Sequence, residues 1–166
     1  MREITHIVLH CTAGPSTQTI PVIKAYWKNE LGWKNPGYHY LIPTDGKYEK
    51  IHPIELISNG VAGHNSKSIH ISYIGGVEVL QSKNPKGKVI NVVGKAKDTR
   101  TNEQIAAQIV IIGKLRKLFP KAKIRGHRDF SIDKNKDGII QPNEWMKSCP
   151  SFDVVAWCNS VGIDPL

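Results

Sequence analysis

The sequence lacks any long hydrophobic run, and this absence argues against a membrane-spanning protein. A spanning helix needs roughly 20 consecutive apolar residues, and nothing among the 166 residues approaches that length. The amino-terminal segment MREITHIVLHC is a poor signal peptide, because its apolar run is short and is interrupted by Glu3 and His6. We therefore expect no membrane insertion and no export signal, so that the protein is cytoplasmic as synthesised.

Cysteine is also scarce. The chain has three cysteines, too few for the disulfide framework of a small secreted protein. Cys11 and Cys158 are expected to be buried free thiols, with a bridge between them as the alternative. Cys149 belongs to a motif described below. This pattern favours a reducing compartment at the time of folding.

Positive charge is abundant but is not organised into a recognisable motif. The 23 Lys and Arg residues outnumber the 14 Asp and Glu residues, for a net charge of +9. No basic block, zinc-finger spacing or aromatic RNA-binding motif accompanies this excess, so we expect no nucleic-acid partner. Two interpretations stay open with equal weight: a surface that favours anionic partners such as the cell envelope, and a basic surface that is simply solvated.

The apolar periodicity predicts an α/β protein. Alternation predicts a strand over residues 4–11, in which Ile7, Leu9 and Cys11 share one face and His10 lies on the other. Further strands are predicted within residues 36–42, 45–52, 68–76 and 122–127, and helices over residues 20–31, over 101–119 and after residue 151. We expect one domain over residues 1–166, with a central mixed β-sheet flanked by helices.

Local signals add detail to the helices and to one long connection. Thr19 is the expected cap of the first helix, with Pro21 in its first turn, and Thr101 with Gln104 resembles a capping box. Ser151 is the expected cap of the last helix. Residues 81–100 are polar and contain glycine, so we expect a mobile excursion on the surface. The residues expected to pack inward are Ile105, Ile109, Ile112 and Phe119 in the long helix and Val154, Val155 and Trp157 in the last one.

Residues 133–144, DKNKDGIIQPNE, match the twelve-residue calcium loop of an EF-hand. The predicted ligands, in loop order, are Asp133, Asn135, Asp137, the backbone carbonyl of Ile139, and the carboxylate of Glu144. Gly138 fits the sharp turn, and Pro142 fits the start of a short exit helix, NEWMK. The preceding RGHRDFSI does not resemble an entering helix, and Asp, Asn and Gly also form simple turns. The glutamate at the last position favours calcium over that alternative.

The residues on either side of this loop predict a second metal site. His127 and Cys149 are soft ligands of the kind that zinc prefers. A catalytic zinc needs about three protein ligands and one open position, and His10, at the end of the first strand, is the natural third candidate. Taken alone, a histidine at the end of a strand is more often structural than a ligand.

The segments THIVLHCTAG, GYHYLI, GVAGHNSKSIHISYIGG, RGHRD and KSCPSFD follow one another along nearly the whole chain. In this order they resemble the zinc-dependent N-acetylmuramoyl-L-alanine amidases of the phage lysozyme and peptidoglycan-recognition type. The resemblance implies that His10, His127 and Cys149 bind zinc, that Tyr38 and Lys147 are the two catalytic side chains, and that His64 lines the substrate groove. The calcium-like loop departs from the compact members of the family, in which the connection is shorter.

The implied chemistry is consistent with these residues. Two neutral imidazoles and one thiolate leave a zinc site with net positive charge, able to activate water and to polarise a carbonyl. The oxyanion formed on an amide then needs a donor, and either Tyr38 or Lys147 suits that role or proton delivery to the amine. For His64 a structural loop histidine is an equal alternative. His39 is expected on the opposite face of its strand, and His6, His52 and His70 are expected to be structural or surface residues.

We therefore expect a monomeric zinc amidase that cleaves the bond between N-acetylmuramic acid and L-alanine in peptidoglycan. The absence of an export signal and of a wall-binding domain favours a phage or prophage lysin that reaches the wall after release by another route. Calcium in the loop would order the segment that carries Lys147 and Cys149. The alternatives are a peptidoglycan-binding module without hydrolysis, and a regulatory protein that uses the same fold to bind another macromolecule.

Overall fold

Five strands form the central sheet in the computed structural model, which describes residues 2–166. They are β1 (His6–Cys11), β2 (Tyr40–Ile42), β3 (Glu49–Lys50), β4 (Ser68–Tyr73) and β7 (Lys123–Gly126). Their spatial order is β3-β2-β4-β1-β7. All neighbouring pairs are parallel except β2 with the edge strand β3. The mixed sheet expected from the sequence is confirmed.

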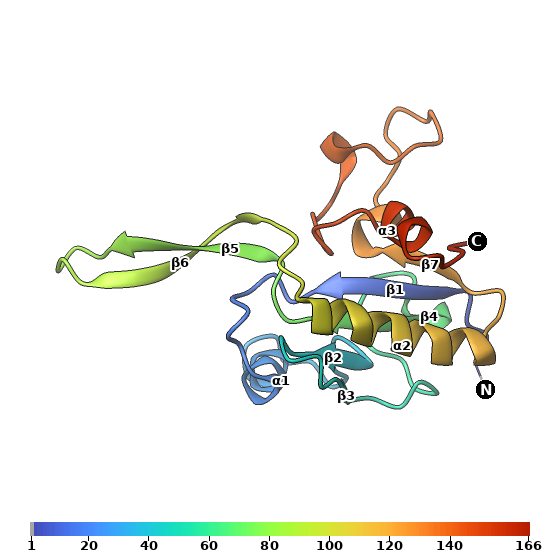
Figure 1. Ribbon diagram of the computed structural model, residues 1–166, viewed down its shortest axis with the longest axis horizontal. Coiled ribbons are helices and arrows are strands. Elements are labelled where there is room, and N and C mark those ends of the chain that lie inside the picture. Colours follow the sequence, from blue (N-terminus) through green and yellow to red (C-terminus); the bar gives the residue numbers. More distant parts are fainter. Residues whose placement is uncertain (1) are drawn as a thin grey trace.

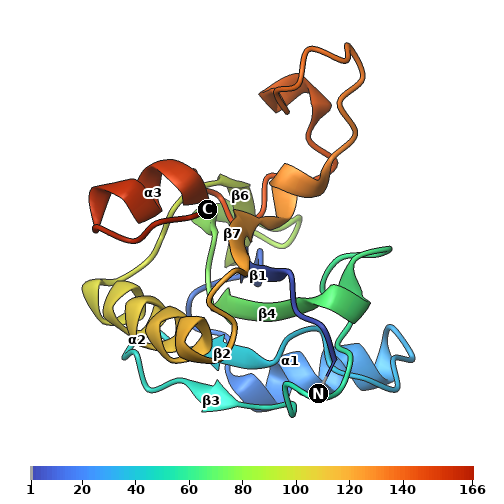
Figure 2. The same cartoon turned by 90° about the vertical axis from the view of Figure 1, so that its right-hand side faces the viewer.

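Helices cover both faces of this sheet. Figure 2 shows α2 (Asn102–Leu118) and α3 (Val154–Ser160) on one side and α1 (Ile20–Asn29) on the other. The alternation of β1 decides which side chains each helix meets. Ile7 and Leu9 pack in the larger apolar cluster with α2 and α3, while α1 packs against Leu41 and Ile74 in a smaller one. His10 therefore projects from the α1 face of the sheet.

The buried face of α2 differs from the predicted stripe. The capping box is confirmed, since the Thr101 side chain accepts a hydrogen bond from the Gln104 backbone N–H. Ile109, however, is 37% exposed. The helix itself carries apolar side chains on several sides, so tertiary contacts rather than periodicity decide which side is buried. Gln104 anchors it, because its amide donates to the carbonyls of Ile42 and Ile74. The buried residues are Gln104, Ala107, Gln108, Ile111, Ile112 and Leu115.

Two other helix ends also differ from the sequence-based expectations. The cap of α3 is Asp153, whose carboxylate accepts from the Ala156 N–H at 2.8 Å. Ser151 instead has a φ of 72° and donates from its hydroxyl to the Gly76 carbonyl. Val154 is buried as predicted, but Val155 is 36% exposed. In α1, Pro21 lies in the first turn as expected, while the Thr19 side chain makes no capping hydrogen bond.

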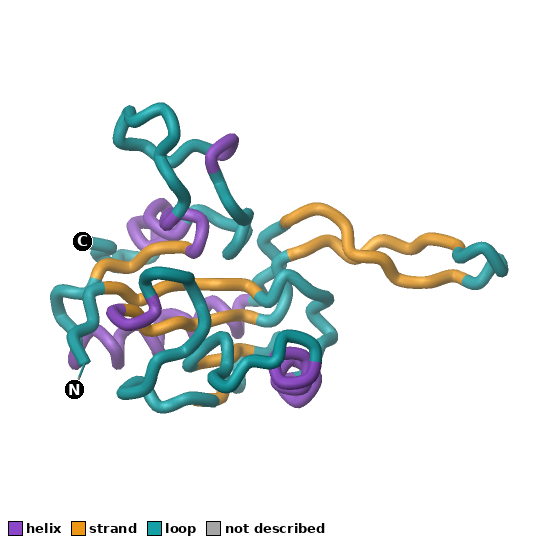
Figure 3. Tube along the Cα trace, turned by 180° about the vertical axis from the view of Figure 1, so that it is seen from behind, coloured by secondary structure: helices purple, strands orange, loops and turns teal. Residues whose placement is uncertain are grey.

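Residues 77–96 form a two-stranded antiparallel ribbon, where the sequence predicted a mobile polar excursion on the surface over residues 81–100 but no strands. Its strands are β5 (Val77–Lys83) and β6 (Val89–Ala96). Figures 1 and 3 show it extending from the body of the protein. The branched side chains of β6 outweigh the local glycines and lysines, and the Asn84 side chain closes the turn by accepting from the backbone N–H groups of Lys86 and Lys88.

The connection from β7 to α3 contains two short 3-10 helices, η2 (His127–Phe130) and η3 (Pro142–Glu144). Pro142 begins η3 as predicted, but the helix ends at Glu144 and does not continue through NEWMK. The calcium-like loop, residues 133–144, follows η2, includes η3 and extends away from the sheet (Figure 2). The connection meets the sheet at His127 on one side of the loop and at Cys149 on the other.

Candidate metal centre

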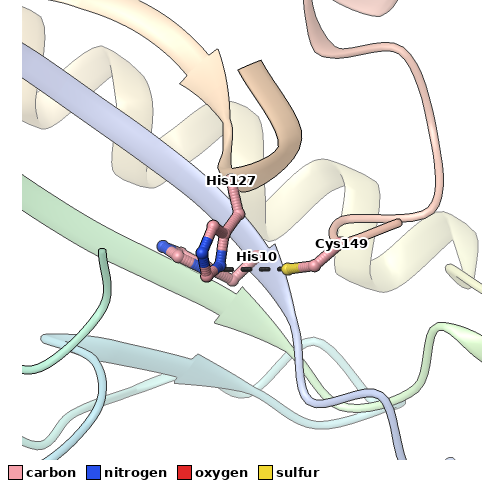
Figure 4. Close-up of side chains that lie close together, drawn as sticks. All are labelled: His10, His127 and Cys149. Carbon is pink, nitrogen blue, oxygen red and sulfur yellow. Dashed lines mark hydrogen bonds between the residues drawn. The ribbon is translucent and has the colours of Figure 1, made fainter. Parts of the chain in front are cut away.

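His10, His127 and Cys149 meet at the carboxyl ends of two neighbouring strands. Because β1 and β7 pair in parallel, with Leu9 opposite Gly126, the residues that follow these positions lie side by side. Cys149 reaches the same point from the connection before α3, as Figure 4 shows. One ligand atom from each residue lies within 4.8 Å of the others, and residues 2–166 contain no second such group of His, Cys, Asp and Glu. The sequence-predicted zinc ligands are therefore brought together.

The spacing of these atoms fits a tetrahedral zinc ion. The Nδ1 atom of His10 lies 3.6 Å from the sulfur of Cys149. Zinc–nitrogen and zinc–sulfur bonds of about 2.05 and 2.3 Å at a tetrahedral angle require about 3.6 Å between such atoms. Two imidazoles and a thiolate also form a donor set that binds zinc in preference to calcium or magnesium. The three residues leave a fourth position for water or substrate.

The protonation states are consistent with metal binding. Burial, followed by the charges of His70, His127 and Lys147, lowers the pKa of His10 well below its usual range. Burial and the charge of Lys147 lower the pKa of His127 to about 4. Both imidazoles are thus neutral near pH 7, as ligands must be. Burial raises the pKa of Cys149, so its thiolate form needs a neighbouring cation. The backbone N–H of Cys11 also donates a hydrogen bond to the Cys149 sulfur at 3.3 Å.

His70 holds the far side of the His10 ring. Its Nδ1 atom lies 3.0 Å from the Nε2 atom of His10, and both side chains are completely buried. When Nδ1 of His10 faces a metal, Nε2 carries the proton and donates to His70. Gly60 lies against the His70 ring, because a Cβ atom at Gly60 would come within 2.3 Å of it. The sequence predicted a structural or surface residue, and alternation alone could have placed it on the same face as His10.

Tyr38 and Lys147 both line a cavity of about 410 Å³ beside the metal ligands. The Tyr38 ring packs against His10, with centroids 4.9 Å apart, and its hydroxyl donates to the Cys11 carbonyl at 3.4 Å. Burial raises the pKa of Tyr38, so the phenol keeps its proton. A second cavity of about 510 Å³ shares Trp27, Trp33, Tyr38 and Lys147 with the first. Together they form a groove that leads to the metal centre.

The other histidines lie outside this centre. His64 packs on Phe130, with ring centroids 4.7 Å apart, and does not line the groove. His39 is buried, and its Nδ1 atom lies within hydrogen-bonding distance of the Ser58 hydroxyl and of the His70 backbone N–H. His6 also packs on Phe130, with ring centroids 5.3 Å apart, and His52 contacts the Ile57 carbonyl.

Backbone N–H groups hold the carboxylates of the calcium-like loop. Asp133 accepts from Gly138 at 2.8 Å, and Asp137 accepts from Ile139 at 2.8 Å. Glu144 accepts from Lys134 at 2.8 Å and from Gln141 at 2.9 Å. The acidic oxygens do not form a compact group like that of the zinc ligands within residues 2–166. Calcium binding by this loop stays a prediction.

Comparison with known proteins gives consistent results. A family described as N-acetylmuramoyl-L-alanine amidase matches residues 1–151. The endolysin of Enterobacteria phage K11 is 28% identical over 157 residues, which cover 94% of this chain and 86% of that protein. The solved structure of the Ph2119 endolysin, from a Thermus scotoductus bacteriophage, has a TM-score of 0.66 and 25% identity, and covers 98% of this chain and 86% of its own. A bumblebee protein, PGRP-SA, shares the fold with a TM-score of 0.67 at 15% identity, over 94% of this chain and 80% of its own.

Proposed function

The chain belongs to the N-acetylmuramoyl-L-alanine amidase family, and we propose that it cleaves peptidoglycan with one zinc ion held by His10, His127 and Cys149. The bond broken is the amide between the lactyl group of N-acetylmuramic acid and L-alanine. The observation that carries this proposal is the convergence of these three ligand atoms within 4.8 Å at one end of the groove. Proteins similar to this chain include the endolysins of phages K11 and KP32, which supports a phage or prophage lysin that acts on the wall after release.

The chain's own residues prepare the metal site for hydrolysis. A bound zinc supplies a Lewis acid that activates water and polarises the scissile carbonyl. His10 and His127 bind as neutral ligands because burial suppresses their protonation. With zinc bound, one thiolate and two neutral imidazoles would leave a net charge of about +1 on the site, which would suit Lewis-acid chemistry.

Tyr38 and Lys147 supply the proton donors that amide cleavage needs. Tyr38 remains a phenol at neutral pH because burial raises its pKa. Its 3.4 Å hydrogen bond to the Cys11 carbonyl is long, so the hydroxyl can turn toward an oxyanion in the groove. Lys147 lines the same cavity and brings a positive charge. One donor stabilises the oxyanion and the other delivers a proton to the leaving amine.

We assign substrate binding to the groove, and we keep His64, which follows the groove-lining Ala62 by two residues, as a proposed contact for the wall substrate. Trp27 and Trp33 line both cavities of the groove, and such flat apolar surfaces suit the faces of sugar rings and the methyl groups of a stem peptide. A His64→Ala variant should raise KM for wall fragments without changing kcat. An unchanged KM would leave His64 as a packing partner of Phe130.

The deciding experiment measures new L-alanine amino termini released from purified walls. We expect release by the zinc-loaded protein, no release by Cys149→Ala, and one zinc per chain in the wild type only. A protein that binds walls with zinc present but releases no amino termini would be a binding module instead. A regulatory protein on the same fold would keep its full biological effect in the Cys149→Ala variant.

We further propose that the loop at residues 133–144 binds calcium and thereby stabilises the zinc site. Its pattern supplies Asp133, Asn135, Asp137, the Ile139 carbonyl and Glu144 as oxygen ligands. Glu144 is already oriented by the backbone of Lys134 and Gln141 at the two ends of the loop. Without a cation the three carboxylates repel one another, so calcium would order the segment that ends at Lys147 and Cys149.

The calcium proposal is tested with wild type and Asp133→Asn, which keeps the side-chain shape but removes one charge. We expect calcium to raise the Tm and slow zinc loss in the wild type, and to do neither in the variant. A calcium-selective chelator that leaves both properties of the wild type unchanged would refute the proposal.

A further inference from the structure

The β5–β6 ribbon is attached to the body of the protein only at its base. It leaves the sheet after Gly76 and returns at Lys97, whose backbone N–H donates to the Gly76 carbonyl at 3.1 Å. Beyond this point the two strands pair with each other and with no strand of the central sheet. Figures 1 and 3 show the ribbon extending from the body. An isolated two-stranded ribbon is marginally stable in water.

Apolar side chains lie on both faces of this ribbon. In the strand register Val79 is opposite Val93, and Leu80 is opposite Val92, so the two pairs project to opposite sides. The exposed fractions are 55% for Val93, 49% for Leu80 and 43% for Val79. An apolar patch on one face would suit a protein partner, whereas apolar residues on both faces suit a medium that surrounds the ribbon.

The same ribbon is strongly basic. Residues 79–97 contain five lysines and no Asp or Glu. Lys83, Lys86 and Lys88 surround the tip, and Lys95 and Lys97 lie near the base, where Lys97 forms an ion pair of 3.9 Å with Glu78. The lysines of residues 83–97 are exposed. The charge is therefore concentrated at both ends of the apolar section.

We propose that this ribbon attaches the enzyme to the surface of an anionic lipid bilayer. Lysines bind anionic headgroups, and apolar side chains next to them enter the interfacial region. The outer edges of β5 and β6 carry unpaired backbone groups, which cannot enter the hydrocarbon, so the ribbon lies in the headgroup region. No helix within residues 2–166 has the length and apolarity to cross a bilayer.

Two other occupants fit the ribbon less well. A soluble anionic polymer would use the lysines but would leave the apolar side chains of both faces in water. A second copy of the chain could cover one apolar face, but it would bring two sets of five lysines together with a single acid, Glu78, in each ribbon to compensate them. An anionic bilayer satisfies the charge and both faces at once.

The proposal is independent of hydrolysis, because the ribbon contributes no residue to the metal centre or the groove. Binding is measured by co-sedimentation with vesicles of phosphatidylcholine alone and with vesicles of equal parts phosphatidylcholine and phosphatidylglycerol. We expect the wild type to bind the anionic vesicles only, and to bind them equally well after zinc is removed. Loss of amidase activity would therefore not affect this result.

Two triple variants separate charge from apolar contact. Replacing Lys83, Lys86 and Lys88 with glutamine should weaken binding roughly a hundredfold, since each lysine contributes about fivefold. Its control replaces Lys24, Lys117 and Lys121, which are exposed on other elements, and loses the same net charge. Replacing Leu80, Val89 and Val93 with threonine should weaken binding about tenfold or more. Its control replaces Val22, Val110 and Val161 with threonine.

The possible outcomes distinguish the occupants. Selective loss in both ribbon variants, with normal zinc content and activity on soluble wall fragments, supports the proposal. Equal loss in the lysine control would show a nonspecific effect of net charge and would overturn it. Unchanged binding by the threonine variant, together with binding to polyphosphate, would assign the ribbon to a soluble polyanion. A dimer in sedimentation equilibrium that the threonine variant abolishes would assign it to a second copy.

Discussion

Replacing His70 should weaken zinc binding although His70 does not touch the metal. Its Nδ1 atom lies 3.0 Å from Nε2 of His10 in a fully buried contact, and it accepts a hydrogen bond from Nε2 when that nitrogen carries the proton. Zinc on Nδ1 of His10 requires that proton to stay on Nε2. In the zinc-free protein the proton can instead move to Nδ1 and face Cys149, which lies 3.6 Å away. The loss of the acceptor therefore disfavours the zinc-bound state selectively.

Leucine and asparagine make a matched pair at this position. They have nearly the same shape, and both remove the ring that packs on Gly60, so the packing loss is shared. Asparagine can place its Oδ1 atom where Nδ1 of His70 lies, and leucine has no acceptor. A buried donor left without a partner costs about 1–3 kcal/mol, which corresponds to a factor of about 5–150 in affinity. We expect His70→Leu to bind zinc about 10–100 times more weakly than His70→Asn.

The assay is competition for zinc against a chromophoric chelator, with the thermal unfolding of both zinc-free variants as the control for folding. Cobalt substitution gives a second readout, because its absorption reports the geometry of the ligand field independently of activity. If His70→Leu and His70→Asn bind zinc with equal affinity and give the same cobalt spectrum, the hydrogen bond does not position His10. Equal weakening of both variants would assign the effect to the lost ring.

Three further predictions concern the groove and the fold. Tyr38→Phe and Lys147→Met should each lower kcat by a factor of about 10²–10³ with unchanged zinc content. The variant that also changes the pH dependence of kcat identifies the proton donor. Full activity in either variant would remove that residue from the mechanism. Burial lowers the pKa of His39 to about 4 from its usual 6.5, so the unfolded chain binds more protons than the folded one between these pH values. The free energy of unfolding of the zinc-free protein should therefore fall as the pH drops from 6.5 to 4, by at most about 1.4 kcal/mol per pH unit for this group. His39→Asn, which keeps an acceptor for the His70 N–H without a titrating ring, should flatten that dependence, and an identical slope in denaturant titrations would contradict the assignment. Gln104→Leu should lower the free energy of unfolding by about 1–3 kcal/mol, because the buried carbonyls of Ile42 and Ile74 lose their donor, whereas Gln141→Leu on the exposed loop should change it little.

Local chemistry made several elements predictable from sequence. The capping box of Thr101 and Gln104 involves residues three apart, so no distant contact was needed to predict the start of α2. The alternation in residues 4–11 placed His10 and Cys11 on opposite faces for the same reason. Pro142, which begins η3, is an equally local signal. The fold class followed from such elements, because their order along the chain indicates a mixed sheet with helices on its faces.

Signals that depend on distant neighbours were weaker or misleading. The inward face of α2 was predicted only in part, since Ile112 is buried but Ile109 is exposed. The helix carries apolar residues on several sides, and the carbonyls of Ile42 and Ile74 decide which side turns inward. The cap of α3 was assigned to Ser151, but that hydroxyl is used by the Gly76 carbonyl from another part of the chain. Residues 81–100 resembled an irregular excursion because each strand of a ribbon gains regularity only from pairing with the other.

The metal centre shows where sequence stops and tertiary structure begins. The sequence determined which residues can bind zinc, since histidine and cysteine chemistry belongs to the side chains themselves, and their arrangement in motifs indicated the amidase family. Their convergence depends on the parallel pairing of β1 with β7, which brings together positions 117 residues apart (127 − 10). The pairing of β1 with β4, which is also parallel, places His70 beside the far nitrogen of the His10 ring. No local pattern could specify that contact, because a buried hydrogen bond between strands exists only after the sheet has formed.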